Sequence, residues 1–370
     1  MVVDNGTDRN SCVNIYFILS CFYRIKRAFT SNNRVILVEP VLKAVNLKGG
    51  YLLGSLYASA SQQGSYVDAV SDVSLELFRN EIFGIAGESG CGKSTLIKIL
   101  YGYLEPPLVL KDGLVYLYTK EGKEISITST SKEQLKKDVF WRHISYIPQS
   151  SMNVLNPTMR VRDHFAEMLK LHANMSKEEA YKEAGKYVEY MGLPRDVLAA
   201  FPHQLSGGMR QRVVISLALL MRPDLILADE PTSALDVINQ QAVLTMLRDS
   251  QESLKNTIVI VSHDMGIHGV VTHRVAIMYA GRIVEIGKTE EIFEDPLHPY
   301  TQALIKALPR LGDKAQREGL SGRPPDLKSP PLGCRFRPRC PSYGSQCKEE
   351  TPTLIEVKPG HYVECWQYST

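Results

Sequence analysis

Residues 82–104 carry the feature that most restricts how this chain can fold. They read IFGIAGESGCGKSTLIKILYGYL: an apolar run, a glycine-rich turn and an apolar-periodic helix. Gly87, Gly92, Lys93 and Ser94 match the G-x-x-x-x-G-K-S pattern of a phosphate-binding loop. Glycines let successive backbone N–H groups converge on phosphate oxygens, and the helix N-terminus adds about half a positive charge. The segment therefore predicts a strand, a nucleotide-phosphate loop and a helix in an α/β fold.

The residue types in this loop indicate individual roles. We expect the Lys93 ammonium to reach the β- and γ-phosphates and the Ser94 hydroxyl to bind Mg²⁺. Cys91 lies at the helix N-terminus, a setting that lowers the pKa of a thiol, so we expect its alkylation to block ATP binding. The alternative is that Cys91 is only a small filler side chain. The predicted nucleotide-binding loop comprises Gly87, Glu88, Ser89, Gly90, Cys91, Gly92, Lys93, Ser94 and Thr95.

Two further apolar runs end in polar residues. DLILADEP (224–231) and TIVIVSHD (257–264) predict buried strands of a parallel sheet that helices cover on both faces. Ligands of such sheets collect at the carboxyl ends of the strands. We expect Asp229 to hold Mg²⁺ through water and Glu230 to polarise the attacking water. Taken alone, His263 is more often structural than catalytic.

The order and spacing of the motifs resemble those of the ATP-binding cassette (ABC) ATPases over roughly residues 41–290. The resemblance implies an α/β P-loop NTPase with a mainly parallel core sheet, an antiparallel β subdomain and a helical subdomain at about 150–205. It implies an ATPase that uses ATP and Mg²⁺. The motifs that carry it are GESGCGKST, IPQ (147–149), LSGGMRQR (205–212), LADEPTSALD (227–236) and SHD (262–264).

This resemblance also implies roles for single residues. Gln149 looks like the residue that senses Mg²⁺ and the γ-phosphate, and Glu230 and His263 look like the catalytic pair. Asp236 ends the segment that lines a dimer seam in the family. Ser206, Gly207 and Gly208 are similar to the signature loop, which grips the γ-phosphate of a partner subunit's ATP.

The family stacks adenine on an aromatic side chain upstream of the phosphate loop. Tyr51, Tyr57 and Tyr66 are the candidates here. Tyr51 fits the family spacing from the Asn46-Leu47 pair best, although the stretch after it is longer than usual. Tyr57 remains the alternative.

The helical subdomain has its own local pattern. Ser176 and Glu179 form a capping box, and apolar residues then recur on one helix face until a glycine and proline stop. Residues 153–169 are similar to the segment that meets a membrane subunit in importers. The alternative is that they only pack the subdomain. The apolar residues of the predicted helix face are Ala180, Ala184, Val188 and Met191.

The end of the chain resembles one particular group of ABC ATPases. EDPLHPYTQALIKALPRL (294–311) resembles the C-terminal extension of ATPases from the oligopeptide/dipeptide uptake family, and GCRFRPRCPSYGSQC…GHYVECW continues that likeness. The cysteines have the spacing C-x5-C-x6-C-x17-C. Four thiolates suit a [4Fe–4S] cluster, and some family members carry one, whereas disulfides and a zinc site remain alternatives. The cysteines are Cys334, Cys340, Cys347 and Cys365.

These patterns predict three regions. Residues 1–33 form a poorly structured leader, 34–293 an ABC ATPase domain, and 294–370 the C-terminal extension as a small cysteine-containing domain. The leader contains a short apolar run, but no basic segment precedes it and no cleavage site follows it. A net charge of +3 does not favour a nucleic-acid partner, and no run reaches the roughly 18 apolar residues of a membrane-spanning helix.

The resemblance implies the nucleotide-binding subunit of an ABC importer for oligopeptides or dipeptides. Its expected partners are a paralogous ATPase, as a heterodimer, or a second copy of itself, together with two permeases and an extracellular solute-binding protein. It would then lie on the cytoplasmic face of the membrane. Relatives also carry sugars or nickel. A non-transport ABC ATPase is the rival, but such proteins lack this cysteine tail.

Overall fold

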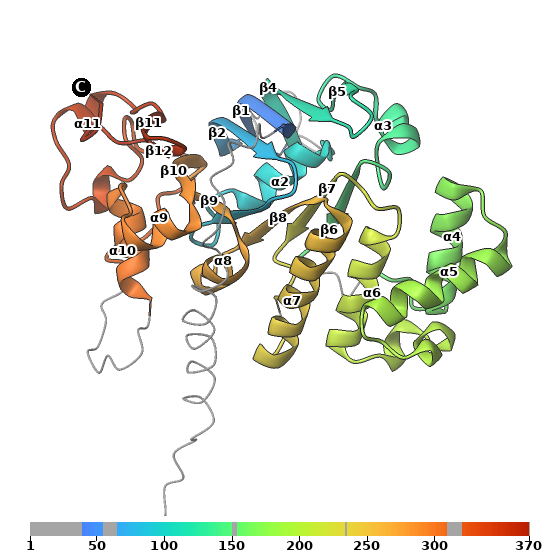
Figure 1. Ribbon diagram of the computed structural model, residues 1–370. Helices are drawn as coiled ribbons and strands as arrows, with labels where there is room; N and C mark the ends of the chain where they lie inside the picture. Colours follow the sequence, from blue (N-terminus) through green and yellow to red (C-terminus); the bar gives the residue numbers. More distant parts are fainter. Residues whose placement is uncertain (1–38, 55–64, 150–153, 234, 309–319, 370) are drawn as a thin grey trace, which may run out of the picture.

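The structure is a computed structural model that describes residues 39–54, 65–149, 154–233, 235–308 and 320–369. The predicted leader and Tyr57 lie outside the described residues. Two sheets and the helices packed on them make up the fold (Figure 1). The strands are β1 (Pro40–Leu53), β2 (Ser65–Phe78), β3 (Ile82–Ala86), β4 (Leu108–Tyr118), β5 (Glu124–Ser126), β6 (Ile144–Ile147), β7 (Leu225–Asp229), β8 (Thr257–Ser262), β9 (Arg274–Tyr279), β10 (Arg282–Lys288), β11 (Ile355–Lys358) and β12 (His361–Val363).

Helices of very different length connect these strands. The α-helices are α2 (Lys93–Tyr101), α3 (Lys132–Asp138), α4 (Val161–Ala173), α5 (Lys177–Tyr190), α6 (Gly207–Leu219), α7 (Val237–Leu254), α8 (Met265–Val271), α9 (Thr289–Glu294), α10 (Pro299–Ala307) and α11 (Gln346–Glu349). The 3-10 turns are η2 (Arg195–Ala199), η3 (Pro202–Gln204) and η4 (Arg337–Arg339). Among the described helices, none is long and apolar enough to cross a membrane.

The larger sheet has the strand order β11-β12-β10-β9-β3-β8-β7-β6, and the smaller one β2-β1-β4-β5. Strands β6, β7, β8, β3 and β9 run parallel to one another, whereas the small sheet is antiparallel. Strands β9 and β10 form a hairpin and pair antiparallel. The predicted fold class, an α/β P-loop fold with a mainly parallel core, is confirmed.

The central strands are buried on both faces, which explains their continuous apolar runs. Along β8, Val259 and Val261 belong to the core formed with α2 and the small sheet. Ile258 and Ile260 point to the opposite face and pack in the core formed with helices α4 to α7. Two apolar cores therefore hold the carboxyl ends of β3, β7 and β8 at one edge of the sheet.

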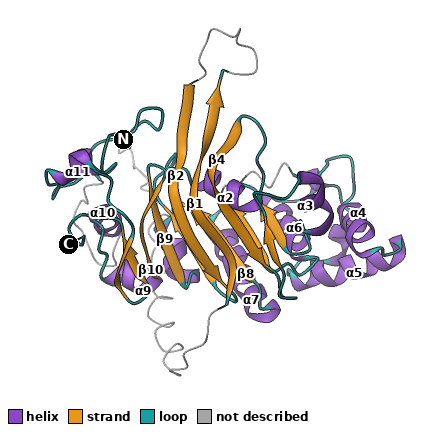
Figure 2. Cartoon of the chain, turned by 90° about the horizontal axis from the view of Figure 1, so that it is seen from above, coloured by secondary structure: helices purple, strands orange, loops and turns teal. Residues whose placement is uncertain are grey.

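Helix α5 forms where the sequence predicts it. The Ser176 side chain accepts a hydrogen bond from the Glu179 N–H, and the Glu179 carboxylate accepts one from the Ser176 N–H. The predicted apolar face is buried, since Ala180, Ala184 and Val188 have no exposed surface. Helices α4 and α5 form an arm at one end of the molecule, opposite the C-terminal extension (Figures 1 and 2).

The C-terminal extension continues the core sheet, because β12 pairs with β10 and β11 with β12. Buried Glu285 on β10 accepts hydrogen bonds from the N–H groups of Leu297 and His298, and His361 Nε2 lies 2.8 Å from Oε1 of the same carboxylate. Phe336 is fully buried against Tyr279 and Tyr300. The extension therefore shares a sheet and an apolar core with the ATPase part.

Candidate nucleotide site

The phosphate loop lies between β3 and α2, as the sequence predicts. Gly92 caps α2 with φ of 107°, a left-handed conformation that favours glycine. A Cβ on Gly92 would lie 2.0 Å from the carbonyl oxygen of Ala69. The backbone of β2 thus approaches the loop so closely that only glycine fits there.

Lys93 is buried beneath the phosphate loop. Its Nζ donates hydrogen bonds to the carbonyl oxygens of Gly87, at 2.7 Å, and Glu88, at 3.0 Å. These contacts place the ammonium on the inner side of the loop. The positive charge of Lys93 therefore lies close to the place where phosphate oxygens would contact the N–H groups of the loop.

The expected lowering of the Cys91 pKa is wrong, whereas the effect of alkylation on ATP binding stays a prediction. The thiol is buried, and burial raises its pKa, which the nearby Lys93 ammonium offsets only partly. Desolvation disfavours the thiolate more than the helix N-terminus favours it. Cys91 is also a member of the apolar core beneath the loop. This geometry favours the alternative, a small core side chain, over a reactive thiol.

A hydroxyl and a carboxylate meet at the edge of the sheet where Mg²⁺ is predicted to bind. Ser94 Oγ donates a hydrogen bond to Asp229 Oδ1 at 3.0 Å, and the Tyr146 hydroxyl donates one to Oδ2 at 3.2 Å. Burial raises the pKa of Asp229, and these two hydrogen bonds counteract that effect. Oxygen ligands of this kind are those that Mg²⁺ prefers. Tyr146 was missed from the sequence because nothing in the spacing of β6 distinguishes it.

The predicted catalytic residues converge on one carboxylate. Gln149 Nε2 donates a hydrogen bond to Glu230 Oε2 at 3.0 Å, and His263 Nδ1 lies 2.9 Å from Glu230 Oε1. Glu230 has a φ of 46°, which is unusual for a side chain of this size. Such strained backbone is common at functional sites. Three motifs that lie far apart in the sequence thus meet around Glu230.

Of the two adenine-stacking candidates that the structure describes, Tyr51 contacts the phosphate-loop helix. It lies on β1, and its hydroxyl is 3.2 Å from Thr95 Oγ1. Tyr66 lies on β2, where the Lys111 ammonium covers its ring at 3.1 Å. The ring of Tyr66 is therefore occupied on one face, whereas Tyr51 lies beside the helix that follows the phosphate loop.

The signature residues lie at the start of α6, beside the start of α7. Ser206 caps α6 by accepting a hydrogen bond from the Met209 N–H, and Asp236 caps α7 by accepting one from the Asn239 N–H. A Cβ on Gly208 would lie 2.7 Å from Asn239 Oδ1. The two predicted dimer-facing segments are thus in contact through Gly208 and Asn239.

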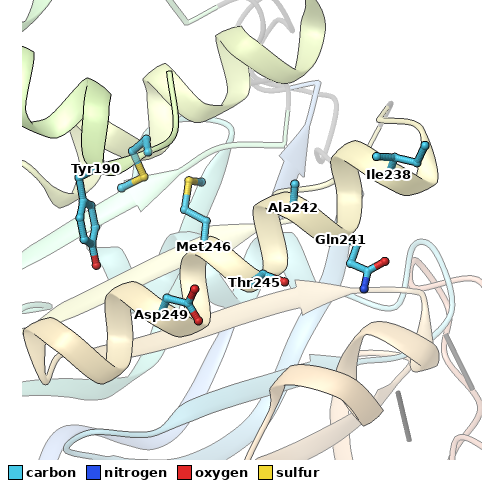
Figure 3. Close-up of a pocket in the computed structure, with 8 residues that line it drawn as sticks. Tyr190, Ile238, Gln241, Ala242, Thr245, Met246 and Asp249 are labelled. Carbon is cyan, nitrogen blue, oxygen red and sulfur yellow. The ribbon is translucent and has the colours of Figure 1, made fainter. Parts of the chain in front are cut away.

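A cavity of about 540 Å³ lies away from all these residues, between α5 and α7. Figure 3 shows Tyr190 of α5 facing Met246 and Asp249 of α7, with Ile238 near the other end. The Tyr190 hydroxyl is 2.6 Å from Ser253 Oγ. The cavity follows the seam between the helical arm and the core, and none of the predicted site residues lines it.

The four cysteines of the C-terminal extension line one cavity of about 240 Å³, together with His298 and Trp366. Each is a free thiol. The Cys334 N–H donates to the Cys347 carbonyl at 2.9 Å, so two of the cysteine segments are in direct backbone contact. Burial raises the pKa of Cys334 to about 11 and also raises those of Cys340 and Cys365.

A second group of possible metal ligands lies outside the C-terminal extension. Among the described residues, only Glu121, His143 and Asp224 bring three possible donor atoms within 4.8 Å of one another. Asp224 is already flanked by the cations of Arg79, at 3.5 Å, and Lys120, at 3.7 Å. This cluster is therefore best explained as an ion-pair network. The sequence analysis did not identify it.

Known proteins resemble this chain in both of its parts. Residues 70–233 match the family described as ABC transporter, and residues 284–347 match the oligopeptide/dipeptide transporter C-terminal region. A dipeptide transport ATP-binding protein of Bacillus subtilis, DppD, is 40% identical over 84% of this chain and 92% of its own length. An oligopeptide transport ATP-binding protein of Salmonella typhimurium, OppD, is 38% identical over 81% of this chain and 88% of its own length.

Solved structures agree with the fold. A dimeric ATP-binding cassette bound to ADP and phosphate in a post-hydrolysis state has a TM-score of 0.56 to this chain and 26% sequence identity. That likeness covers 67% of this chain and 98% of the other. The part of this chain beyond such a cassette therefore has no counterpart in that structure.

Proposed function

Because this chain belongs to the ABC transporter ATP-binding proteins that carry the oligopeptide/dipeptide transporter C-terminal region, we propose that it drives the import of oligopeptides or dipeptides. The chain is an ATPase of this family. The observation that carries the ATPase part of the proposal is the convergence of Gln149 and His263 on Glu230, next to the Ser94–Asp229 pair, and the C-terminal region at 284–347 supports the peptide substrate. This arrangement has the parts that phosphoryl transfer to water requires.

Each residue around the phosphate loop has its own role in ATP binding and hydrolysis. Lys93 and the loop N–H groups bind the β- and γ-phosphates. Ser94, directly, and Asp229, through water, would hold Mg²⁺, which would neutralise phosphate charge. The Glu230 carboxylate accepts a proton from the attacking water, with His263 and Gln149 fixing the direction of that carboxylate. Tyr51 stacks on the adenine.

One chain supplies one phosphate loop and one signature loop, so a complete site needs two chains. Ser206, Gly207 and Gly208 of one subunit contact the ATP held by the other. The contact of Gly208 with Asn239 supports this assignment, because it links the signature loop to the segment that ends at Asp236. We favour a paralogous ATPase as the second subunit over a second copy of this chain.

The membrane partners follow from the same assignment. Two permease subunits hold this chain peripherally at the cytoplasmic face of the membrane, and an extracellular binding protein captures the solute. The arm formed by α4 and α5 carries the segment predicted to meet a permease. Because the same arm leads to Ser206 through η2 and η3, its movement changes the distance between the signature loop and the partner's nucleotide.

The cysteine-lined cavity is suited to a [4Fe–4S] cluster. In a tetrahedral zinc site, thiolates with Zn–S bonds of about 2.3 Å lie only about 3.8 Å apart. The four cysteines form no such close set among the described residues, but in a [4Fe–4S] cluster each thiolate binds a different iron and the sulfurs lie further apart. Their common cavity and soft donor atoms support the proposal. Residues 294–370 then form a cluster-binding extension of the ATPase part at 34–293, with which it shares a sheet and an apolar core.

Uptake by reconstituted vesicles tests the transport proposal. The complex should be purified with its permeases and binding protein, and ATP-driven uptake of labelled oligopeptides, dipeptides, oligosaccharides and Ni²⁺ compared. We expect peptide uptake that stops with Glu230→Gln. Uptake of sugar or nickel alone would overturn the peptide assignment, and absence of co-purifying membrane proteins would favour a non-transport ATPase.

Anaerobic purification tests the cluster. We expect broad absorption near about 400 nm, with iron and acid-labile sulfide in equal amounts, and loss of both in Cys340→Ser. The control is Cys91→Ser, because Cys91 lies in the core beneath the phosphate loop and should leave the absorption unchanged. Stoichiometric zinc without iron would contradict the cluster.

A further inference from the structure

The C-terminal extension touches the phosphate loop itself, at Glu88. This residue is the second of the loop motif, directly after Gly87. Two residues of the extension reach it: Tyr300 in α10 and Arg339 at the end of η4, immediately before Cys340. Neither residue belongs to the predicted nucleotide site, and both lie more than 200 positions further along the chain, at separations of 212 and 251 residues.

The backbone of Glu88 is held on both sides. Its N–H donates a hydrogen bond to the Tyr300 hydroxyl at 3.0 Å, and its carbonyl oxygen accepts one from Lys93 Nζ at 3.0 Å. Tyr300 is fully buried and stacks near Tyr279 and Phe336, so its hydroxyl has little freedom to move. The extension therefore sets the orientation of a peptide unit inside the phosphate loop.

The side chain of Glu88 is held as well. Arg339 donates from Nη1 to Oε2 at 2.7 Å and from Nη2 to Oε1 at 3.0 Å, a two-point contact that fixes both oxygens. The Arg339 side chain is 4% exposed and that of Glu88 25%. Arg339 Nε also donates to the Ser321 carbonyl at 2.9 Å, which ties the guanidinium to the extension.

An unpaired carboxylate in this place would oppose nucleotide binding. The loop is built to attract phosphate, and a second anion beside it repels the triphosphate through a partly desolvated region. Arg339 neutralises the Glu88 carboxylate and holds it in one direction. We propose that Arg339 and Tyr300 are positioning residues for ATP, and that the C-terminal extension sets the nucleotide affinity of the phosphate loop through Glu88.

Equilibrium binding of Mg-ADP to the purified full chain tests this proposal. We expect Arg339→Ala to raise the Kd about tenfold or more, equivalent to about 1.4 kcal/mol for each factor of ten, and Arg339→Lys to raise it less. The matched control is Arg335→Ala. Arg335 lies in the same segment and pairs with Asp68 of β2, but it does not contact Glu88. An equal rise in both alanine variants would mean that Arg339 only docks the extension, and would overturn the proposal.

A rescue experiment separates positioning from folding. In the Arg339→Ala chain, Glu88→Gln removes the carboxylate charge, so we expect the Kd to return most of the way to the wild-type value. Absence of rescue would contradict the proposal. If Arg339→Ala does not fold, Tyr300→Phe removes one hydroxyl from the Glu88 N–H and should still raise the Kd severalfold; an unchanged Kd would count against it. If the wild-type chain itself fails to bind Mg-ADP, the nucleotide function fails instead.

Discussion

The hydroxyl of Ser94 donates a hydrogen bond to Asp229 Oδ1 at 3.0 Å, although 135 residues separate the two in the sequence. Ser94 is the second residue of α2, the helix that follows the phosphate loop, and Asp229 ends the buried strand β7. The contact therefore joins the two motifs that are predicted to share Mg²⁺. It also shows how the parallel sheet brings distant strand ends together at one edge.

This pairing predicts the effect of removing the hydroxyl. Ser94→Ala should lower ATP hydrolysis about a hundredfold or more, because loss of a metal ligand removes several kcal/mol of charge stabilisation. Ser94→Thr is the matched control, since it keeps the hydroxyl and should retain activity. The measurement is the rate of phosphate release against Mg²⁺ concentration. Equal rates in the alanine and threonine variants would remove Ser94 from the metal site.

A second prediction concerns Glu230, which accepts a hydrogen bond from Gln149 and lies beside His263. Glu230→Gln preserves the shape of the side chain but removes its basicity. Hydrolysis should fall between about a hundredfold and about ten-thousandfold, while ATP-driven association of two ATPase subunits should remain. Phosphate release and size-exclusion chromatography with ATP measure the two effects. Undiminished hydrolysis would show that another group accepts the proton.

The sequence predicted those parts of the site that depend on local patterns. The strand before Gly87, the strand that ends at Asp229 and the capping box at Ser176 all have short-range signatures, and the structure has each of them. The packing of Ile258 and Val259 on opposite faces of one strand follows from the same apolar runs.

Contacts between distant segments could not be predicted in this way. Two such contacts join Tyr146 to Asp229 and Arg339 to Glu88. They depend on how the strands and the C-terminal extension pack, which the spacing of apolar residues does not predict. The pairing of β12 with β10 is of the same kind. The pKa of Cys91 was misjudged because the helix N-terminus is visible in the sequence, whereas the burial that outweighs it is not.

A third prediction separates the two candidates for adenine stacking. Tyr51→Ala should weaken Mg-ATP binding by about 1–3 kcal/mol, the usual value of a base–aromatic stack, and Tyr51→Phe should keep most of the affinity. Tyr57→Ala should change little. Binding of a fluorescent ATP analogue to each variant measures the effect. Weak binding in the Tyr57 variant together with normal binding in Tyr51→Ala would reverse the assignment.

The fourth prediction concerns pH and His268, a fully buried residue of α8. Its Nε2 lies 3.3 Å from the Ser262 carbonyl, and a Cβ on Gly84 would approach its Nδ1 to 2.4 Å, so the backbone of β3 packs directly against the ring. Burial lowers the pKa of His268 to about 4, which the hydrogen bond to Ser262 only partly opposes. The folded chain therefore keeps the ring neutral at pH values where the unfolded chain protonates it.

The sign of the effect follows from proton uptake. Between about pH 6.5 and about pH 4 the unfolded state binds one more proton at this position, so the free energy of unfolding falls as the pH is lowered. From pH 7 to pH 5 this one residue should remove about 2 kcal/mol, at about 1.4 kcal/mol for each pH unit below its unfolded pKa. His268→Gln keeps a donor for the Ser262 carbonyl but does not titrate. Urea unfolding at pH 7 and at pH 5 measures the free energy of unfolding of both proteins. Between these pH values it should fall by about 2 kcal/mol less in His268→Gln than in the wild-type chain. An equal fall in both proteins would mean that His268 is already protonated in the folded state.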